Sequence, residues 1–213
     1  MALCIFILEL IGTASFAISG AMVGLSRKMD IFGVAILGLA TATGGGVLRD
    51  ILLGDFPPMM FQNPVYAFVA ILVSVIVFIP LVCQWLTQNK KLYELMMFFT
   101  DTVGLGIFTV VGTQAAFLDG YHNLFLAVFV GTITGVGGGV LRDVLSKNMP
   151  YIFVKHIYAL AAIIGSLACG LLYEPAGRWI SMFVGLFLIV IIRCLAAYFR
   201  WSLPKSQGLE ELQ

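Results

Sequence analysis

Charged residues are scarce in this chain, and their scarcity excludes several classes of protein. Asp, Glu, Lys and Arg make up 11% of the 213 residues, against about 25% in soluble domains. The net charge is +1, with no basic patch to suit nucleic acid and no acidic tail to suit a basic partner. A disordered chain or a coiled coil would carry far more charge than this.

Cysteine is also scarce, and the sequence contains no catalytic pattern. No two cysteines form a CxxC pair, which argues against a disulfide scaffold or a zinc site; the four are Cys4, Cys83, Cys169 and Cys194. There is no nucleophile–base pair, metal-ligand spacing or phosphate-binding loop. We therefore expect no enzymatic activity and no bound cofactor.

Apolar residues dominate instead. They make up 61% of the chain, and the mean hydropathy is +1.03. One membrane-spanning helix uses roughly 20 residues, and a soluble protein of this length could not bury so much apolar surface. We therefore predict an all-α, polytopic protein in which residues 1–213 form a single membrane domain. Polar breaks divide the chain into seven predicted spans and a polar tail over 201–213; the spans are 3–25, 31–53, 64–86, 93–117, 122–146, 152–172 and 179–200.

Basic residues are distributed unevenly between the two ends of these spans. Eight follow odd-numbered spans, whereas Arg178 alone follows an even-numbered one. Since Lys and Arg mark the cytoplasmic side of a membrane, the bias predicts an external N-terminus and a cytoplasmic C-terminus. Three more lie inside spans, and one of these, Arg193, is close enough to the end of the last span for its side chain to reach the membrane surface.

The chain contains an internal repeat. Residues 43–52 match residues 136–145 at an offset of 93, and both segments contain GGGVLRD. Upstream the offset is 92, and there Glu9 aligns with Asp101. The first repeat covers spans 1–3 (3–86), the second covers spans 4–6 (93–172), and the span over 179–200 stands alone. Because each repeat has three spans, the two copies should cross the membrane in opposite directions.

Three consecutive glycines lie in the middle of spans 2 and 5. Each glycine loses up to about 1 kcal/mol of helix propensity relative to alanine. We predict that both helices are broken there, at Gly44, Gly45, Gly46, Gly137, Gly138 and Gly139. Free carbonyls at the breaks, on Thr43, Gly44, Val136 and Gly137, would then suit a cation. The alternative is that the glycines allow close helix packing.

Each triple glycine is followed by two charged residues inside the membrane, Arg49–Asp50 and Arg142–Asp143. A charge at this depth destabilises insertion by at least about 2.5 kcal/mol and marks a functional candidate. Neighbours in sequence do not face each other on a helix, so we expect pairing across the repeats, Arg49 with Asp143 and Arg142 with Asp50. Donation to free carbonyls at the glycine breaks is a second possibility. A purely structural role, locking the repeats together, is a third.

The matched acids Glu9 and Asp101 lie in spans 1 and 4. They would attract cations at the two mouths of a pathway, or accept hydrogen bonds from neighbouring helices. Two arginines against four carboxylates give these six groups a net charge of −2, which favours a cation pathway. Ser and Thr are concentrated on spans 1, 2, 4 and 5, so we expect these spans to line the path and spans 3, 6 and 7 to face lipid or other subunits.

Two inverted three-span repeats with GGGxxRD in each, plus a seventh span, resemble the prokaryotic branch of the trimeric intracellular cation (TRIC) channel family. These bacterial sequences are also grouped as a glycine transporter family. The resemblance runs from about Glu9 to Arg200. It implies a homotrimer in a bacterial or archaeal plasma membrane, with one pore per protomer between kinked spans 2 and 5.

The same resemblance implies that potassium or sodium is the transported monovalent cation. Carried over by position, the kinks are the two triple glycines and the gate residues are Arg49, Asp50, Arg142 and Asp143. The expected partners are other copies of the chain, the lipid bilayer and monovalent cations. A secondary transporter of a small zwitterion such as glycine fits the same architecture, since an arginine could hold a carboxylate and an aspartate an amine.

Overall fold

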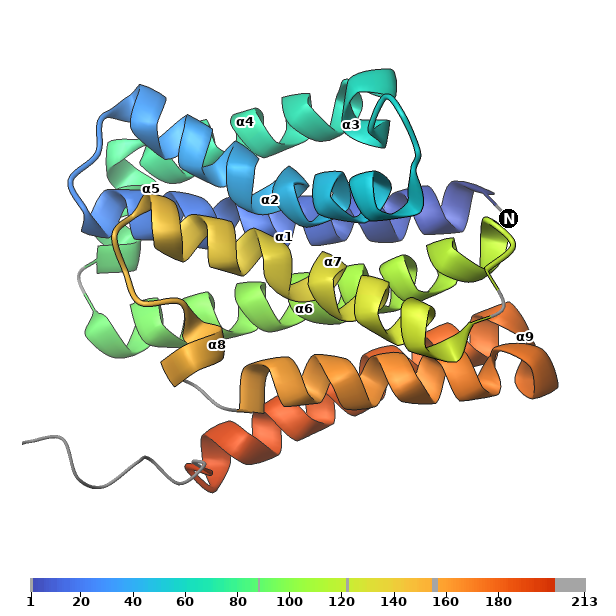
Figure 1. Ribbon diagram of the computed structural model, residues 1–213. Helices are drawn as coiled ribbons and strands as arrows, with labels where there is room; N and C mark the ends of the chain where they lie inside the picture. The colour runs from blue at the N-terminus through green and yellow to red at the C-terminus, as the bar shows by residue number, and fades with distance from the viewer. Residues whose placement is uncertain (1, 88, 122, 155–156, 202–213) are drawn as a thin grey trace, which may run out of the picture.

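The computed structural model describes residues 2–87, 89–121, 123–154 and 157–201, and nearly all of them are helical. Figure 1 shows the long helices lying side by side in a bundle, with the short helices near its two ends. In chain order the helices are α1 (Ala2–Ser26), α2 (Ile31–Leu53), α3 (Met59–Gln62), α4 (Val65–Phe78), α5 (Pro80–Thr87), α6 (Lys90–Leu118), α7 (Leu124–Leu145), α8 (Tyr151–Val154) and α9 (Ile157–Tyr198).

Polar side chains in the breaks between apolar runs define where several helices begin. Asp30 accepts a hydrogen bond from the backbone N–H of Gly33, which satisfies a free donor in the first turn of α2. Asn89 caps α6 and Asn123 caps α7 in the same way. At its other end α2 stops at Gly54, whose φ of 83° is a left-handed conformation that glycine adopts readily.

The helices are long and apolar enough for a multi-pass membrane protein. Among the described residues, α1, α2, α6, α7 and α9 could each cross a membrane, and α4 with α5 forms a sixth candidate bent by 74°. α9 has 42 residues and would be about 63 Å long if straight, roughly twice the hydrocarbon thickness. Its helical dihedrals are interrupted at Gly177 (φ 79°, ψ 166°), and Figure 1 shows that the chain folds back there. The two halves of α9 correspond to the predicted spans 152–172 and 179–200.

The predicted third span, 64–86, contains the bend between α4 and α5. Ile79 has a ψ of 133°, outside the helical range, and it precedes Pro80. Proline lacks a backbone N–H and disfavours the helical conformation in the residue before it. Pro80 is therefore the signal in the sequence for this bend. The predicted cytoplasmic tail, 201–213, lies outside the described residues except for Trp201.

The segments predicted as two repeats run in opposite directions. In Figure 1, α1 is antiparallel to α6, and α2 is antiparallel to α7. Phe16 on α1 stacks on its repeat counterpart Phe108 on α6, with ring centroids 5.4 Å apart. Gly12 lies against Phe108, and the matching Gly104 lies against Phe16. Matched positions thus make reciprocal contacts, as expected of an inverted repeat.

The triple glycines do not break the helices that contain them. α2 is helical throughout 44–46, and α7 is helical throughout 137–139. The prediction of broken spans 2 and 5 is therefore wrong. In a continuous helix each carbonyl accepts the N–H four residues further along. The free carbonyls predicted as a cation site, those of Thr43, Gly44, Val136 and Gly137, are not formed.

Close packing explains the glycines instead. A Cβ on Gly45 would lie 2.1 Å from the carbonyl oxygen of Thr134, and a Cβ on the matched Gly138 would lie 2.1 Å from the carbonyl oxygen of Thr41. No side chain fits at such a distance, so α2 and α7 meet backbone to backbone where they cross.

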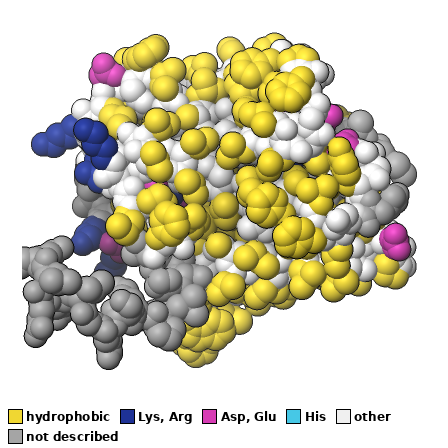
Figure 2. Space-filling model, viewed as in Figure 1, with side chains coloured by type: hydrophobic (Ala, Val, Ile, Leu, Met, Phe, Trp, Pro, Cys, Tyr) yellow, Lys and Arg dark blue, Asp and Glu magenta, His cyan; other side chains and the backbone are white. Residues whose placement is uncertain are grey.

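Apolar side chains cover the face of the bundle seen in Figure 2, and Lys and Arg gather at one end of it. Over the whole surface, the large apolar side chains more than 60% exposed include Phe68, Phe125 and Phe187. Such a surface suits a lipid environment. The end that carries Arg27 and Lys28 is called the basic end below; α3 lies at the opposite end.

We expect Gly45→Ala to destabilise the protein and Gly46→Ala to be tolerated. The added methyl group would strike the Thr134 backbone at position 45, whereas no neighbouring atom of the described residues lies within 4 Å of a Cβ at position 46. Overpacking of this kind typically destabilises by about 1–3 kcal/mol. Thermal unfolding in detergent measures the difference, and equal melting temperatures for the two variants would contradict the α2–α7 contact.

Candidate functional site

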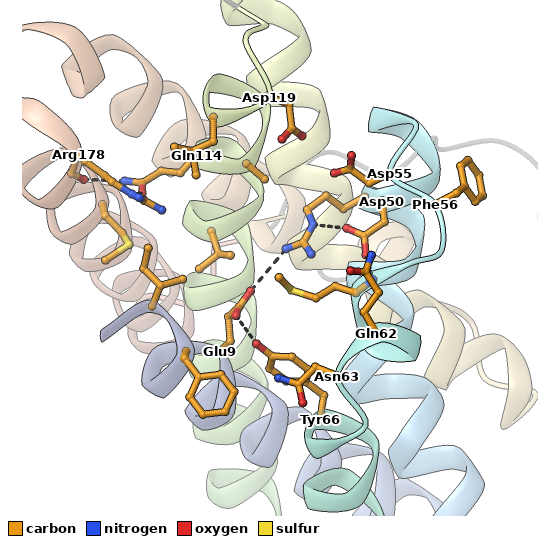
Figure 3. Close-up of a pocket in the computed structure, with 18 residues that line it drawn as sticks. Glu9, Asp50, Asp55, Phe56, Gln62, Asn63, Tyr66, Gln114, Asp119 and Arg178 are labelled. Carbon is orange, nitrogen blue, oxygen red and sulfur yellow. Dashed lines mark hydrogen bonds and ion pairs between the residues drawn. The ribbon is translucent and has the colours of Figure 1, made fainter. Parts of the chain in front are cut away.

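The first of two charged clusters is built by α1, α2 and α4. Arg49 donates from Nε to Asp50 Oδ1 at 2.8 Å, and its Nη1 lies 3.8 Å from Glu9 Oε1. The other oxygen of Glu9 accepts a hydrogen bond from the Tyr66 hydroxyl at 2.6 Å, as Figure 3 shows. All four residues are buried among the helices. We call this set the first cluster.

The first cluster lines a cavity of about 600 Å³, the first cleft, at the end opposite the basic end. Figure 3 shows Gln114 and Arg178 on the far side from Tyr66, and Asp55 facing Asp119 at one edge. Arg178 donates from Nε to the side-chain oxygen of Gln114 at 2.9 Å. The cleft is therefore polar on several sides and large enough for hydrated ions or a small molecule.

The second cluster is the repeat counterpart of the first, and it is more deeply buried. Arg142 is 0% exposed. It donates from Nη1 to Asp101 Oδ1 at 2.7 Å and from Nε to Asp143 Oδ1 at 2.9 Å, and it also donates to the Ser19 hydroxyl. The Tyr158 hydroxyl lies 3.4 Å from Asp101 Oδ1. Glu9, Arg49, Asp50 and Tyr66 thus correspond in order to Asp101, Arg142, Asp143 and Tyr158.

Arg193 completes the second cluster from the last segment of α9, which belongs to neither repeat. Its Nη2 lies 3.2 Å from Asp101 Oδ2, and its Nε lies 3.2 Å from the Thr102 hydroxyl. The guanidinium group also lies 4.7 Å from the ring centroid of Tyr158 and 5.0 Å from that of Phe98. With an exposed fraction of 7%, Arg193 does not reach the membrane surface, so that expectation is wrong.

A second cleft of about 320 Å³ meets this cluster from the basic end. It is lined by Asp101, Tyr158 and Arg193 within the bundle and by Arg200 and Trp201 further out. None of its lining residues is shared with the first cleft. The two clefts therefore open at opposite ends of the bundle and share no lining residue; the second lies between α6, α8 and α9.

The two aspartates of the repeated motif have a second contact each. Asp50 Oδ2 accepts the backbone N–H of Met59 at 2.7 Å, and Asp143 Oδ2 accepts that of Tyr151 at 3.0 Å. Met59 begins α3 and Tyr151 begins α8, where free backbone donors attract a carboxylate. Each aspartate thus joins an arginine to a short helix at one end of the bundle.

The predicted partners of the arginines were wrong. Arg49 does not pair with Asp143, nor Arg142 with Asp50; each arginine contacts its own sequence neighbour and an acid from the first helix of its own repeat. Neighbouring Cβ atoms do diverge on a helix, but the long arginine side chain can fold back so that Nε reaches the next carboxylate. Donation to carbonyls at a glycine break is excluded by the continuous helices.

Sequence reasoning missed Tyr66, Tyr158 and Arg193, because spans 3, 6 and 7 were expected to be lipid-facing. Tyr66 and Tyr158 are 92 positions apart, the same offset as Glu9 and Asp101. Extending the repeat comparison to spans 3 and 6 would have identified both tyrosines. Arg193 has no repeat counterpart, so no such comparison could find it.

The two clefts differ in charge. The first is lined by four carboxylates and two arginines, a net charge of −2: Glu9, Asp50, Asp55, Asp119, Arg49 and Arg178. The second is lined by two acids and two arginines, a net charge of zero: Glu94, Asp101, Arg193 and Arg200. Because of this difference in net charge, the first cleft should attract cations more strongly than the second. Within the first cleft, desolvation raises the pKa of Asp119, and the facing carboxylate of Asp55 raises it further.

We expect Arg142→Gln to destabilise the protein more than Arg49→Gln. Removing Arg142 leaves Asp101 and Asp143 short of a buried counter-charge, and breaking a buried ion pair in this way typically destabilises by about 3–5 kcal/mol. Arg49 instead borders the first cleft, where water can solvate its partners. Thermal unfolding of the two variants in detergent tests this, and an equal loss of stability would show that burial does not distinguish the clusters.

Comparisons with known proteins agree with this architecture. A family model described as glycine transporter matches residues 6–81 and 98–174, one segment in each predicted repeat. The inner membrane protein YadS of Escherichia coli (strain K12) is 35% identical over 202 residues, which cover 94% of this chain and 95% of YadS.

Solved structures are similar over almost their whole length. A chain from work on conductance through TRIC cation channels is 35% identical, with a TM-score of 0.84 and coverage of 95% of this chain and 97% of that one. A TRIC trimeric intracellular cation channel orthologue from Rhodobacter sphaeroides is 29% identical, with a TM-score of 0.85 and coverage of 93% and 99%. The names of these three proteins describe membrane proteins and channels, not enzymes.

Proposed function

This chain belongs to the prokaryotic branch of the TRIC channel family, whose bacterial sequences are also grouped as glycine transporters, and from that premise we propose that it is a passive channel for monovalent cations, potassium and sodium. The observation that carries the proposal is the pair of charged clefts that enter each protomer from opposite ends. Each cleft contains an arginine close to a buried acid, Arg49 with Glu9 in the first and Arg193 with Asp101 in the second.

The path in this proposal runs along α1, α2, α6 and α7 and reaches the basic end through the second cleft, between α6 and α9. A cation enters the first cleft past Asp55 and Asp119, reaches Glu9 and Arg49, and continues along α2. A further cavity of about 40 Å³ extends the cleft there, and Gly46 and Phe108 are among its lining residues. Glycine at position 46 supports a path on this face, because in the described part of the chain no neighbouring atom lies within 4 Å of a Cβ there.

Cations are the ions that the charge of the first cleft supports. Carboxylates at a mouth raise the local concentration of cations and lower that of anions. The excess of basic residues at the other end supports an orientation with the first cleft outside and the second in the cytoplasm. A bacterial plasma membrane is the setting that the relatives' names support.

Planar-bilayer recording in asymmetric potassium chloride tests the proposal. We expect unitary currents that reverse near the potassium potential. Glu9→Gln should reduce the unitary cation current, because it removes a negative charge from the first cleft and retains an acceptor for Tyr66. Glu174→Gln is the matched control, since it removes the same charge from an exposed residue that does not line the cleft. Currents that reverse near the chloride potential would overturn the proposal.

Transport of a small zwitterion such as glycine is the second candidate. The first cleft favours it by offering both signs of charge, with Arg49 and Arg178 available for a carboxylate and Glu9 and Asp50 for an amine. Uptake of glycine into liposomes separates the two functions. Saturable uptake together with silent bilayers would select the transporter, whereas unitary potassium currents unaffected by glycine would select the channel.

We also propose that the chain assembles as a homotrimer, with one path in each protomer. The name of the Rhodobacter sphaeroides orthologue supports this. The expected protein mass in detergent is three times 23.1 kDa, which light scattering coupled to size exclusion measures after subtraction of the detergent. A mass of one or two chains would contradict the trimer without affecting the proposed ion path.

A further inference from the structure

The charged residues and tyrosines of the two clusters correspond by sequence position, with one exception. Glu9, Arg49, Asp50 and Tyr66 each have a counterpart in the second repeat, at an offset of 92 or 93. Arg193 has none, because it lies beyond both repeats. The two halves of the protein therefore differ at the position where a cation would meet the second cluster.

Arg193 forms an ion pair with Asp101, the acid of the second cluster that lines the second cleft. Asp101 Oδ1 already accepts from Arg142, and Arg193 Nη2 lies 3.2 Å from the remaining oxygen, Oδ2. In the first cluster the corresponding Glu9 has no second arginine, and Arg49 lies 3.8 Å away. With Arg193 present, the second cluster is neutral; without it, two acids would face one arginine, as in the first cluster.

Arg193 also packs against the side chain that closes the inner half of the path. Its guanidinium lies over the ring of Tyr158, whose hydroxyl would be 2.9 Å from a Cβ on Gly139. The matched glycine in the first half, Gly46, faces open space. Equivalent faces of α2 and α7 are thus open in one half and covered in the other.

We propose that Arg193 is the gating residue of the cytoplasmic half: its guanidinium neutralises Asp101, holds Tyr158 over Gly139 and blocks cations until it moves away. This inference rests on the proposed channel function. A cation that enters the second cleft meets a positive charge and an acid whose two oxygens are already engaged. Displacement of Arg193 frees Asp101 Oδ2 to bind the cation and releases the contact with Tyr158.

Single-channel recording of Arg193→Gln, Arg193→Lys and the unmodified chain tests this gate. We expect Arg193→Gln to increase the open fraction and to raise the potassium current that enters from the basic end by about tenfold at low ionic strength, since a cleft with net charge concentrates counter-ions to at least that extent. Arg193→Lys retains the charge and should restore most of the original behaviour, which a purely structural role of the side chain would not produce.

Two further variants make the result specific. Lys90→Gln removes a positive charge from the same end of the molecule, at a side chain that is 90% exposed, and should leave the currents unchanged. Thr102→Val removes the acceptor of Arg193 Nε at nearly constant volume, and should raise the open fraction less than Arg193→Gln does. It also provides a test if Arg193→Gln does not fold.

The outcomes separate this inference from the proposed function. If the unmodified chain conducts and a folded Arg193→Gln conducts identically, Arg193 is not the gate and the channel proposal stands. If Arg193→Gln does not fold, unchanged currents in Thr102→Val overturn the gate in the same way. A silent unmodified chain with a conducting Arg193→Gln supports the gate directly. Silence of every folded variant overturns both.

Discussion

The backbone contact between α2 and α7 is the interaction on which the rest of the structure depends. Where the helices cross, Gly45 and Gly138 each lie against a carbonyl of the opposite helix. Moving the helices apart by the size of one methyl group would break this contact, and moving them closer would make the backbones clash. The crossing fixes the distance and the orientation of the two repeats relative to each other. It places Arg49 and Arg142 on opposite sides of the middle of the bundle, each next to the acid on the first helix of its own repeat.

Pairing within each repeat follows from where the charges are buried. A charged side chain in a low-dielectric interior needs a partner at short range, and the acid on the neighbouring helix of the same repeat is within reach. Each repeat is therefore electrostatically nearly complete in itself, with an arginine, two carboxylates and a tyrosine hydroxyl. The halves are joined by the glycine contacts, by the stacked pair Phe16–Phe108 and by the hydrogen bond from Arg142 to Ser19. Arg49 and Arg193 line the clefts, whereas Arg142 lines neither.

Composition and repetition were sufficient to predict the helical membrane fold and the repeat-matched acids and arginines of both clusters, because burial of apolar runs and of intramembrane charges leaves clear patterns in a sequence. They did not identify Tyr66, Tyr158 or Arg193 as members of the clusters. Contacts were harder to predict. The letters GGG are the same whether a helix unwinds or packs closely, and the neighbouring backbone of Thr134 that decides between them is 89 positions from Gly45. The reach of Arg49 to Asp50 depends on side-chain conformation, which helical spacing does not determine. Arg193 reaches Asp101 only because α9 folds back at Gly177.

The aspartates of the repeated motif connect the buried arginines to the short helices at the two ends of the bundle. Asp50 is bonded through one oxygen to Arg49 and through the other to the first backbone N–H of α3, and Asp143 joins Arg142 to α8 in the same way. Because both oxygens of each carboxylate are engaged, the position of the arginine is coupled to the position of the short helix. Arg49 or Arg142 cannot shift without displacing the carboxylate that holds the short helix beside it, so each arginine and that short helix should move together.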